Sequence, residues 1–147
     1  MADRLTKEQR SRNMKAVKAQ SSLENKITKE LWKRGFRFRK NVKNLFGKPD
    51  ISLKRYKIVI FIDSCFWHCC PIHGTMPKSN IDFWEKKLGR NIERDLEVNN
   101  YYIEKGWNIL RLWEHEFKED FDGTIQTIVD FILQNKGKID QILKRTT

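Results

Sequence analysis

The stretch KIVIFIDSCFWHCCPIH occupies residues 57–73. Its first part contains the run VIFI at 59–62, and this continuous β-branched and aromatic run favours a strand that is buried on both faces. Asp63 follows at the carboxyl end of that strand. The sequence has three cysteines and three histidines, and all of them except His115 fall in the residues just after Asp63. We therefore expect a core strand that leads directly into the reactive part of the protein.

The cysteines and histidines are spaced as metal ligands. Cys65, Cys70 and His73 form the pattern Cys-x4-Cys-x2-His, and His115 could complete a tetrahedral zinc site from a neighbouring strand. Cys69 competes with Cys70 for this role, because adjacent side chains point apart and only one of the two is expected to bind. The alternative is a pair of buried thiols with incidental histidines.

A second group of residues suits a harder metal ion. Asp50, which follows Pro49, and Asp63 lie at the ends of two expected strands, and two carboxylates at one sheet edge suit Mg²⁺. His68 is close enough in the chain to accept a proton from a water beside that ion. The alternatives are two aspartates in surface turns and a His68 that serves as a further zinc ligand.

Large apolar side chains accompany these groups. Phe66 and Trp67 lie between the expected zinc and proton-transfer residues, where a rigidly held aromatic wedge could enter a base stack. Insertion costs least where base pairing is already defective, so such a wedge predicts a preference for mismatched DNA. Alternatively, one ring belongs to the core and the other covers the zinc site. Met14 is the large apolar candidate for insertion in the first 20 residues.

The bulk properties point to one nucleic-acid-binding domain. A chain of 147 residues suits a single domain, here 1–147, and its net charge of +11 is concentrated in the first 48 residues. This clustering favours a polyanion such as DNA over a merely solvated surface. No secretory leader or membrane span is predicted, so we expect a cytoplasmic protein with reduced thiols.

The apolar pattern predicts an α/β fold with a mixed central sheet flanked by helices. Residues 1–20 are expected to form a flexible or partly helical basic arm, and a helix is expected from Ser21, with Ser21 and Glu24 as a capping box and Gly35 at its end. Glu24 is thus either a capping carboxylate or a catalytic group. The other expected elements are strands at 36–39, 51–53 and 108–113, a turn at 55–56, a helix at 81–105 interrupted at Gly89 and stopped by Gly106, and a helix at 125–132 with a frayed continuation to 143.

Several motifs together resemble one known family. These motifs are RSRNM ending at Met14, GKPD ending at Asp50, DSCFWHCCPIHGTMPKSN at 63–80, FWEKKLGRNIERD ending at Asp95 and GWNILRLWEHE at 106–116. In this order they resemble the very short patch repair (Vsr) DNA mismatch endonucleases over nearly the whole chain. Ser64 and Cys69 depart from the pattern, since glycine is expected there in many relatives.

The resemblance implies a restriction-endonuclease-like fold with a structural zinc site. It also implies Mg²⁺-dependent nicking on the 5′ side of the thymine in a T·G mismatch, which begins repair of deaminated 5-methylcytosine. For the catalytic site it implies that Asp50 binds Mg²⁺ together with a carbonyl near Ile62 and with Asp63 as a further ligand, that His68 is the general base, and that Glu24 and Asp95 are assisting acids. For the zinc site it implies the ligands Cys65, Cys70, His73 and His115. The intercalating group that it implies consists of Phe66, Trp67 and Met14.

The expected partner is double-stranded DNA with a T·G mismatch, and other mismatch-repair proteins could also bind. A monomer suits the nicking of one strand, and a bacterial-type protein of this kind is expected at the nucleoid. Two other hypotheses stay open. One is a zinc-stapled DNA-binding module without catalysis, which would bind DNA but not nick it. The other is a nuclease of the same fold that cuts matched duplex.

Overall fold

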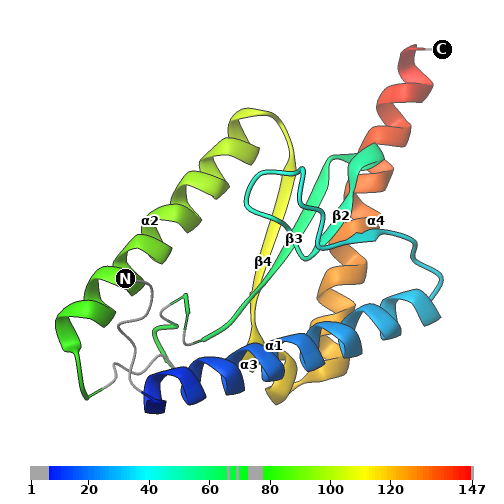
Figure 1. The fold of residues 1–147 in the computed structure, drawn as a ribbon. Helices are drawn as coiled ribbons and strands as arrows, with labels where there is room; N and C mark the ends of the chain where they lie inside the picture. The colour runs from blue at the N-terminus through cyan, green and yellow to red at the C-terminus, as the bar shows by residue number, and fades with distance from the viewer. Residues whose placement is uncertain (1–6, 66, 69, 73–77, 147) are drawn as a thin grey trace.

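The computed structural model describes residues 7–65, 67, 68, 70–72 and 78–146. Its centre is a mixed sheet, as the sequence predicts, and the four strands lie in the order β1-β2-β3-β4 (Figure 1). Neighbouring strands are antiparallel except for β3 and β4, which are parallel. The strands are β1 (Arg39–Lys40), β2 (Ile51–Leu53), β3 (Ile58–Asp63) and β4 (Asn108–Trp113). The helices are α1 (Lys7–Lys33), the short 3-10 helix η1 (Lys54–Tyr56), α2 (Ile81–Glu104), α3 (Glu114–Glu119) and α4 (Phe121–Thr146).

Strand β3 is buried along its whole length, which confirms the prediction for this segment. One of its faces contributes Ile58, Ile60 and Ile62 to a core that includes apolar side chains of α1 and α4. The other face contributes Val59 and Phe61 to a smaller cluster with apolar side chains of α2. Side chains alternate across a strand, so this single element separates two apolar layers. Its carboxyl end points toward the region between α1 and α2 (Figure 1).

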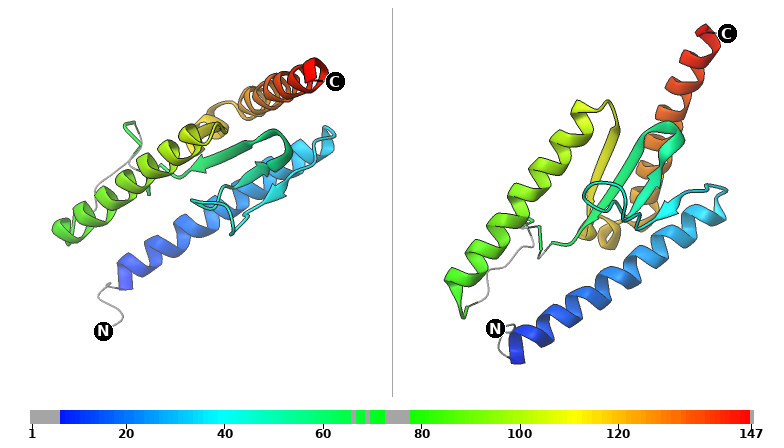
Figure 2. Two further views of the ribbon diagram at one scale, coloured as in Figure 1. Left: turned by 90° about the horizontal axis from the view of Figure 1, so that it is seen from above. Right: turned by 45° about the horizontal axis from the view of Figure 1, so that its top comes forward.

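Helix α1 begins at Lys7, so the predicted start at Ser21 is wrong. Residues 7–20 contain neither glycine nor proline and are rich in good helix formers, so the helix continues upstream of the Ser21 and Glu24 pattern. The predicted end is confirmed, because the helix stops at Lys33 and the N–H of Gly35 donates to the Trp32 carbonyl. The amino-terminal parts of α1 and α2 both extend beyond the sheet (Figure 2).

Helix α2 is continuous from Ile81 to Glu104, so the predicted interruption at Gly89 is wrong. A glycine inside a helix costs about 1 kcal/mol relative to alanine. Burial of the large side chains of Trp84 and Tyr102 on the same helix exceeds that cost. The predicted stop before Gly106 is confirmed.

The remaining differences concern short or terminal elements. The strand expected at 36–39 is reduced to Arg39–Lys40, and Phe36 and Phe38 instead pack against the core from the connecting segment. Helix α3 was not expected. The Glu116 side chain accepts the Trp113 N–H at 2.7 Å and so satisfies a backbone donor at its start. Within the described ranges, no helix combines the length and apolar composition needed to cross a membrane.

Candidate active site and metal centre

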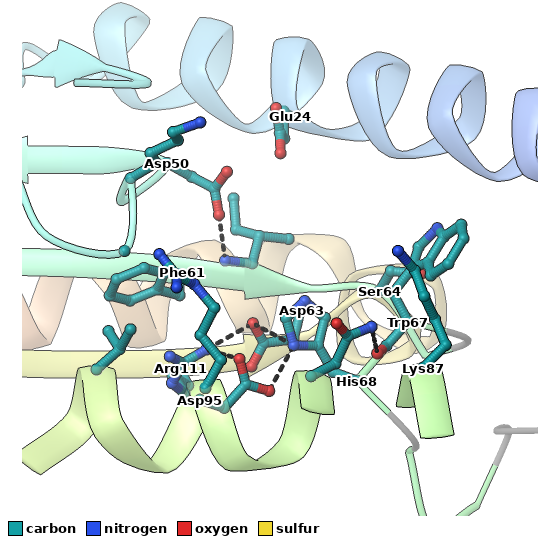
Figure 3. A pocket seen from close by; sticks show the side chains of 16 residues that line it. Glu24, Asp50, Phe61, Asp63, Ser64, Trp67, His68, Lys87, Asp95 and Arg111 are labelled. Atoms are coloured by element: carbon teal, nitrogen blue, oxygen red, sulfur yellow. Dashed lines mark hydrogen bonds and ion pairs between the residues drawn. The ribbon is translucent and has the colours of Figure 1, made fainter. Parts of the chain in front are cut away.

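A cavity of about 440 Å³ opens beside the carboxyl end of β3. All five residues that the sequence nominated for catalysis line it, although they come from four separate parts of the chain: Glu24, Asp50, Asp63, His68 and Asp95. Figure 3 shows that they form two groups, with Glu24 and Asp50 on the α1 side and with Asp63, His68 and Asp95 on the α2 side.

Asp50 immediately precedes β2, and the antiparallel pairing with β3 holds it beside Ile62. Its Oδ2 accepts the backbone N–H of Ile62 at 2.7 Å. Burial and, to a smaller extent, the Glu24 carboxyl group raise the pKa of Asp50, the Ile62 N–H lowers it, and the net result is a pKa of about 8. A bound cation would relieve the repulsion between two carboxylates that face the same space. The oxygen donors present therefore suit a hard divalent ion such as Mg²⁺.

His68 lies in the turn after β3, where its backbone N–H donates to the Ser64 carbonyl at 3.1 Å. Its Nδ1 is 2.6 Å from Oδ2 of Asp95 on α2 and 3.8 Å from Oδ1 of Asp63. Burial by itself lowers the pKa of His68, but the hydrogen bond to Asp95 and the adjacent negative charges outweigh it, so the net shift is upward. We assign the Nδ1 proton to the Asp95 bond, and Nε2 is then the ring atom that can accept a proton.

Arg111 is a site residue that the sequence analysis missed. This β4 residue places Nη1 2.9 Å from Oδ1 of Asp63, and its guanidinium carbon lies 4.3 Å from the centre of the Phe61 ring. Burial raises the pKa of Asp63, while His68 and Arg111 lower it, with a net upward shift. The available signal was an arginine among the apolar residues that follow Asn108 in the strand NILRLW, since a charged residue in a core strand usually has a partner.

Three more basic residues line the cavity, and of these only Lys48 belongs to the basic cluster expected from the sequence. Lys48 lines it from the segment before β2, and Lys87 and Arg94 line it from α2. The surplus of positive charge was expected in the first 48 residues, whereas Lys87 and Arg94 belong to α2.

Three of the four predicted zinc ligands, Cys65, Cys70 and His115, lie just beyond the paired ends of β3 and β4. The parallel register aligns Asp63 with Trp113, and Cys65 and His115 each follow two residues later. The Nδ1 atom of His115 is 3.3 Å from Sγ of Cys65 and 3.4 Å from Sγ of Cys70. Three ligand atoms from these residues lie within 4.8 Å of one another.

These separations fit a tetrahedral metal ion. Sulfur and nitrogen ligands at 2.0 to 2.3 Å from one zinc ion are about 3.5 Å apart. Burial raises the pKa of the Cys65 thiol to about 11, and a bound cation would reverse this shift because it binds the thiolate. Cys70 lies in the cluster, whereas Cys69 and His73 are outside the described residues.

The aromatic candidates are only partly described. Trp67 is half-buried at the cavity, its carbonyl accepts a hydrogen bond from Asn91 Nδ2 at 3.0 Å, and its ring centre is 6.0 Å from that of the buried Trp84. Met14 lies on α1 with 59% of its surface exposed. Phe66 is outside the described residues. Trp67 is therefore anchored at the edge of the site, and Met14 is accessible.

Comparison with known proteins places this geometry in context. A family model described as DNA mismatch endonuclease Vsr matches residues 2–72. The chain is 42% identical over 127 residues to the type II nicking enzyme V.NaeI of Lentzea aerocolonigenes, covering 82% of this chain and 75% of that protein. It is 47% identical over 115 residues to the type II nicking enzyme V.HpaIIP of Haemophilus parainfluenzae, covering 76% of this chain and 82% of that protein. It is 36% identical over 117 residues to DNA mismatch endonuclease Vsr of Escherichia coli strain K12, covering 78% of this chain and 74% of that protein.

Proposed function

Because this chain belongs to the family of Vsr DNA mismatch endonucleases and is a DNA endonuclease, we propose that it nicks one strand of duplex DNA on the 5′ side of the thymine in a T·G mismatch. The observation that carries this proposal is that Asp50 and His68, a carboxyl group and an imidazole, line one cavity. The mixed sheet, with apolar clusters on both faces of β3, supports a restriction-endonuclease-like architecture. We take this architecture to span residues 1–147 as one domain.

The carboxyl group of Asp50 and the carbonyl of Ile62 would hold a catalytic Mg²⁺ ion, with Glu24 facing the same space. When bound, Mg²⁺ supplies positive charge that stabilises the scissile phosphate as it is attacked. The hydrogen bond from the Ile62 N–H fixes Oδ2 of Asp50 and thereby orients the carboxyl group toward the cavity. Glu24 can accept hydrogen bonds from water molecules that share this space.

His68 acts as the general base in this mechanism. Its Nδ1 is held by Asp95 at 2.6 Å, so Nε2 is the ring nitrogen that would accept the proton of the attacking water. The negative charge of Asp95 stabilises the imidazolium that forms when this proton is accepted. Loss of a general base of this kind slows a reaction by about 10²- to 10⁴-fold.

The basic and aromatic residues around the cavity would hold the DNA. Lys48, Lys87 and Arg94 supply positive charge beside the site for backbone phosphates. Trp67, together with Phe66 and Met14, would enter the base stack at the weak pair. A zinc ion bound by Cys65, Cys70 and His115, with His73 as the fourth ligand, would fix the segment that carries Trp67 and His68.

The test is nicking of end-labelled duplexes, with and without one T·G pair, in the presence and absence of Mg²⁺. Asp50→Asn and His68→Ala should bind the mismatched duplex but not nick it. Asp130→Asn, a matched control at an exposed position on α4, should nick like the wild type. Equal nicking of matched duplex would favour a nuclease without mismatch preference. Binding without any nick by the wild type would favour the non-catalytic DNA-binding module.

A further inference from the structure

Arg111 is held from several directions within the active site. In addition to its contact with Asp63, its Nη1 is 3.7 Å from Oδ1 of Asp95, and its Nε donates to Oδ1 of Asn99 at 2.6 Å. The guanidinium group also lies over the Phe61 ring, with its carbon 4.3 Å from the ring centre. Because a guanidinium group is planar and its N–H directions are fixed, these partners determine both its position and its orientation.

Asp63 consequently belongs to the group on the α2 side of the cavity. Its Oδ1 accepts a hydrogen bond from Nη1 of Arg111 at 2.9 Å and lies 3.8 Å from Nδ1 of His68. Figure 3 shows the Asp63 carboxyl group directed toward Arg111 and Asp95, while Asp50 lies across the cavity on the side of Glu24. A divalent ion beside Asp63 would also lie close to the positive charge of Arg111, which repels it.

We propose that Arg111 is a positioning residue that binds Asp63 and Asp95 into one assembly with His68, so that Asp63 supports the general base and is not a ligand of the catalytic metal ion. This inference rests on the proposed role of His68 as general base. From the sequence, Asp63 was expected to share a metal ion with Asp50, whereas under this proposal the two aspartates at the strand ends have separate roles.

The arrangement has a physical reason. Asp63 and Asp95 are two carboxylates close to one imidazole ring, and without a cation between them they would repel each other. Arg111 contacts both and keeps them in place, so that Asp95 remains 2.6 Å from Nδ1 of His68. Asn99 fixes the other edge of the guanidinium group. Removal of Arg111 therefore frees the two acids to move and misdirects the His68 ring.

The first experiment separates the two aspartates by metal binding. Mn²⁺ serves as the probe, and free Mn²⁺ is counted by electron paramagnetic resonance with wild type, Asp50→Asn and Asp63→Asn. In parallel, the Mg²⁺ concentration for half-maximal single-turnover nicking is measured for wild type and Asp63→Asn. Asp63→Asn should bind Mn²⁺ like the wild type and need the same Mg²⁺ concentration, but it should nick more slowly. A tenfold or larger weakening of metal binding by Asp63→Asn, about 1.4 kcal/mol, would overturn the inference.

The second experiment tests Arg111 by kinetics. Arg111→Gln should lower the single-turnover rate by about 10²-fold without changing the DNA concentration for half-saturation, because a misplaced base affects the chemical step. Arg111→Lys should recover part of the rate, since lysine keeps the positive charge but lacks the planar set of N–H donors of the guanidinium group. Arg34→Gln removes an arginine paired with Glu30 far from the cavity and should nick like the wild type.

The outcomes distinguish this inference from the proposed function. If Arg111→Gln lowers the unfolding temperature, Asn99→Ala tests the same positioning while keeping the arginine. It should also lower the single-turnover rate without changing the DNA concentration for half-saturation. A wild type that does not nick the mismatched duplex would remove the proposed function and this inference together. A wild type that nicks, with an inactive His68→Ala and fully active Arg111→Gln and Asn99→Ala, would overturn this inference alone.

Discussion

Asp50 is a carboxyl group whose environment opposes its own ionisation. Burial and Glu24 raise its pKa from 3.8 to about 8, although the Ile62 N–H stabilises the charged form. A group with a raised pKa in the folded chain stabilises the fold below its ordinary pKa, and this contribution is lost as the pH rises toward the folded value. Without added divalent metal, the wild type should therefore lose this stability between about pH 4 and pH 8.

Asp50→Asn should remove this pH-dependent loss while keeping the hydrogen bond from Ile62 through its amide oxygen. The variant should be more stable than the wild type by about 1 to 3 kcal/mol near pH 8, and the difference should shrink toward pH 5. Urea unfolding at several pH values measures this difference. Asp130→Asn, at an exposed site, should show no such trend. Parallel stability curves for Asp50→Asn and the wild type would contradict the explanation.

Gly47 positions the segment that leads to Asp50. Its φ is +76°, and an added Cβ would lie 2.8 Å from both methyl groups of Val98 on α2. Gly47→Ala should therefore lower the free energy of unfolding by about 1 to 3 kcal/mol. Gly89→Ala, where an added Cβ meets nothing within 4 Å, should leave stability unchanged or raise it by up to about 1 kcal/mol.

Denaturant unfolding of both glycine variants, and of Gly47→Ala combined with Val98→Ala, checks this prediction. Truncation of Val98 removes the clash, so the alanine at position 47 should cost less in that background than in the wild type. Equal costs in the two backgrounds would show that the contact with Val98 does not limit this position.

At the scale of elements, the parallel pairing of β3 with β4 brings two of the proposed zinc ligands, Cys65 and His115, together. Cys65 and His115 follow the aligned ends of these strands, and Glu114 Oε1 accepts the Cys65 N–H at 2.9 Å, which ties the two ends further. We expect one zinc ion per chain in protein purified without chelator. Cys65→Ser and Cys70→Ser should lose this ion and unfold at a lower temperature, because a structural zinc site contributes folding free energy.

Cys69→Ser is the matched control for these variants and should retain zinc. Metal analysis together with thermal unfolding gives both readouts. Loss of zinc from Cys69→Ser, with retention in Cys70→Ser, would assign the ligand to the neighbouring position. A protein that contains no zinc in either form would remove the structural zinc from the proposal.

The elements that could be predicted from sequence are those whose own side chains determine them. Strand β3 was predicted because its apolar run is continuous, and its end was predicted to carry the chemistry because the cysteines and all histidines except His115 follow Asp63 directly. The start of α1 was missed because the Ser21 and Glu24 pattern is the same inside a helix as at its beginning. Arg111 was missed because its partners depend on the register that aligns it with Phe61 and on the docking of α2, and neither is specified by local sequence.

At the scale of the whole molecule, the charge of +11 is useful for binding only where it faces the DNA. Lys87 and Arg94 extend from α2 at the cavity, whereas Lys138 is exposed on α4, whose carboxyl-terminal part extends away from β3 and α2 (Figure 1). Each cation that neutralises a phosphate displaces counterions, and the logarithm of the binding constant then falls with the logarithm of salt concentration by about 0.9 per contact.

Lys87→Gln and Arg94→Gln should each reduce the magnitude of this salt slope by about 0.9, the value of one phosphate contact. Each should weaken the binding of matched and mismatched duplex alike, since phosphate contacts carry no sequence information. Lys138→Gln lowers the net charge equally and should leave the slope unchanged. Fluorescence anisotropy at a series of salt concentrations measures all three variants. If the slope falls equally in the three, binding responds to net charge alone, and the cations at the cavity have no special place in DNA recognition.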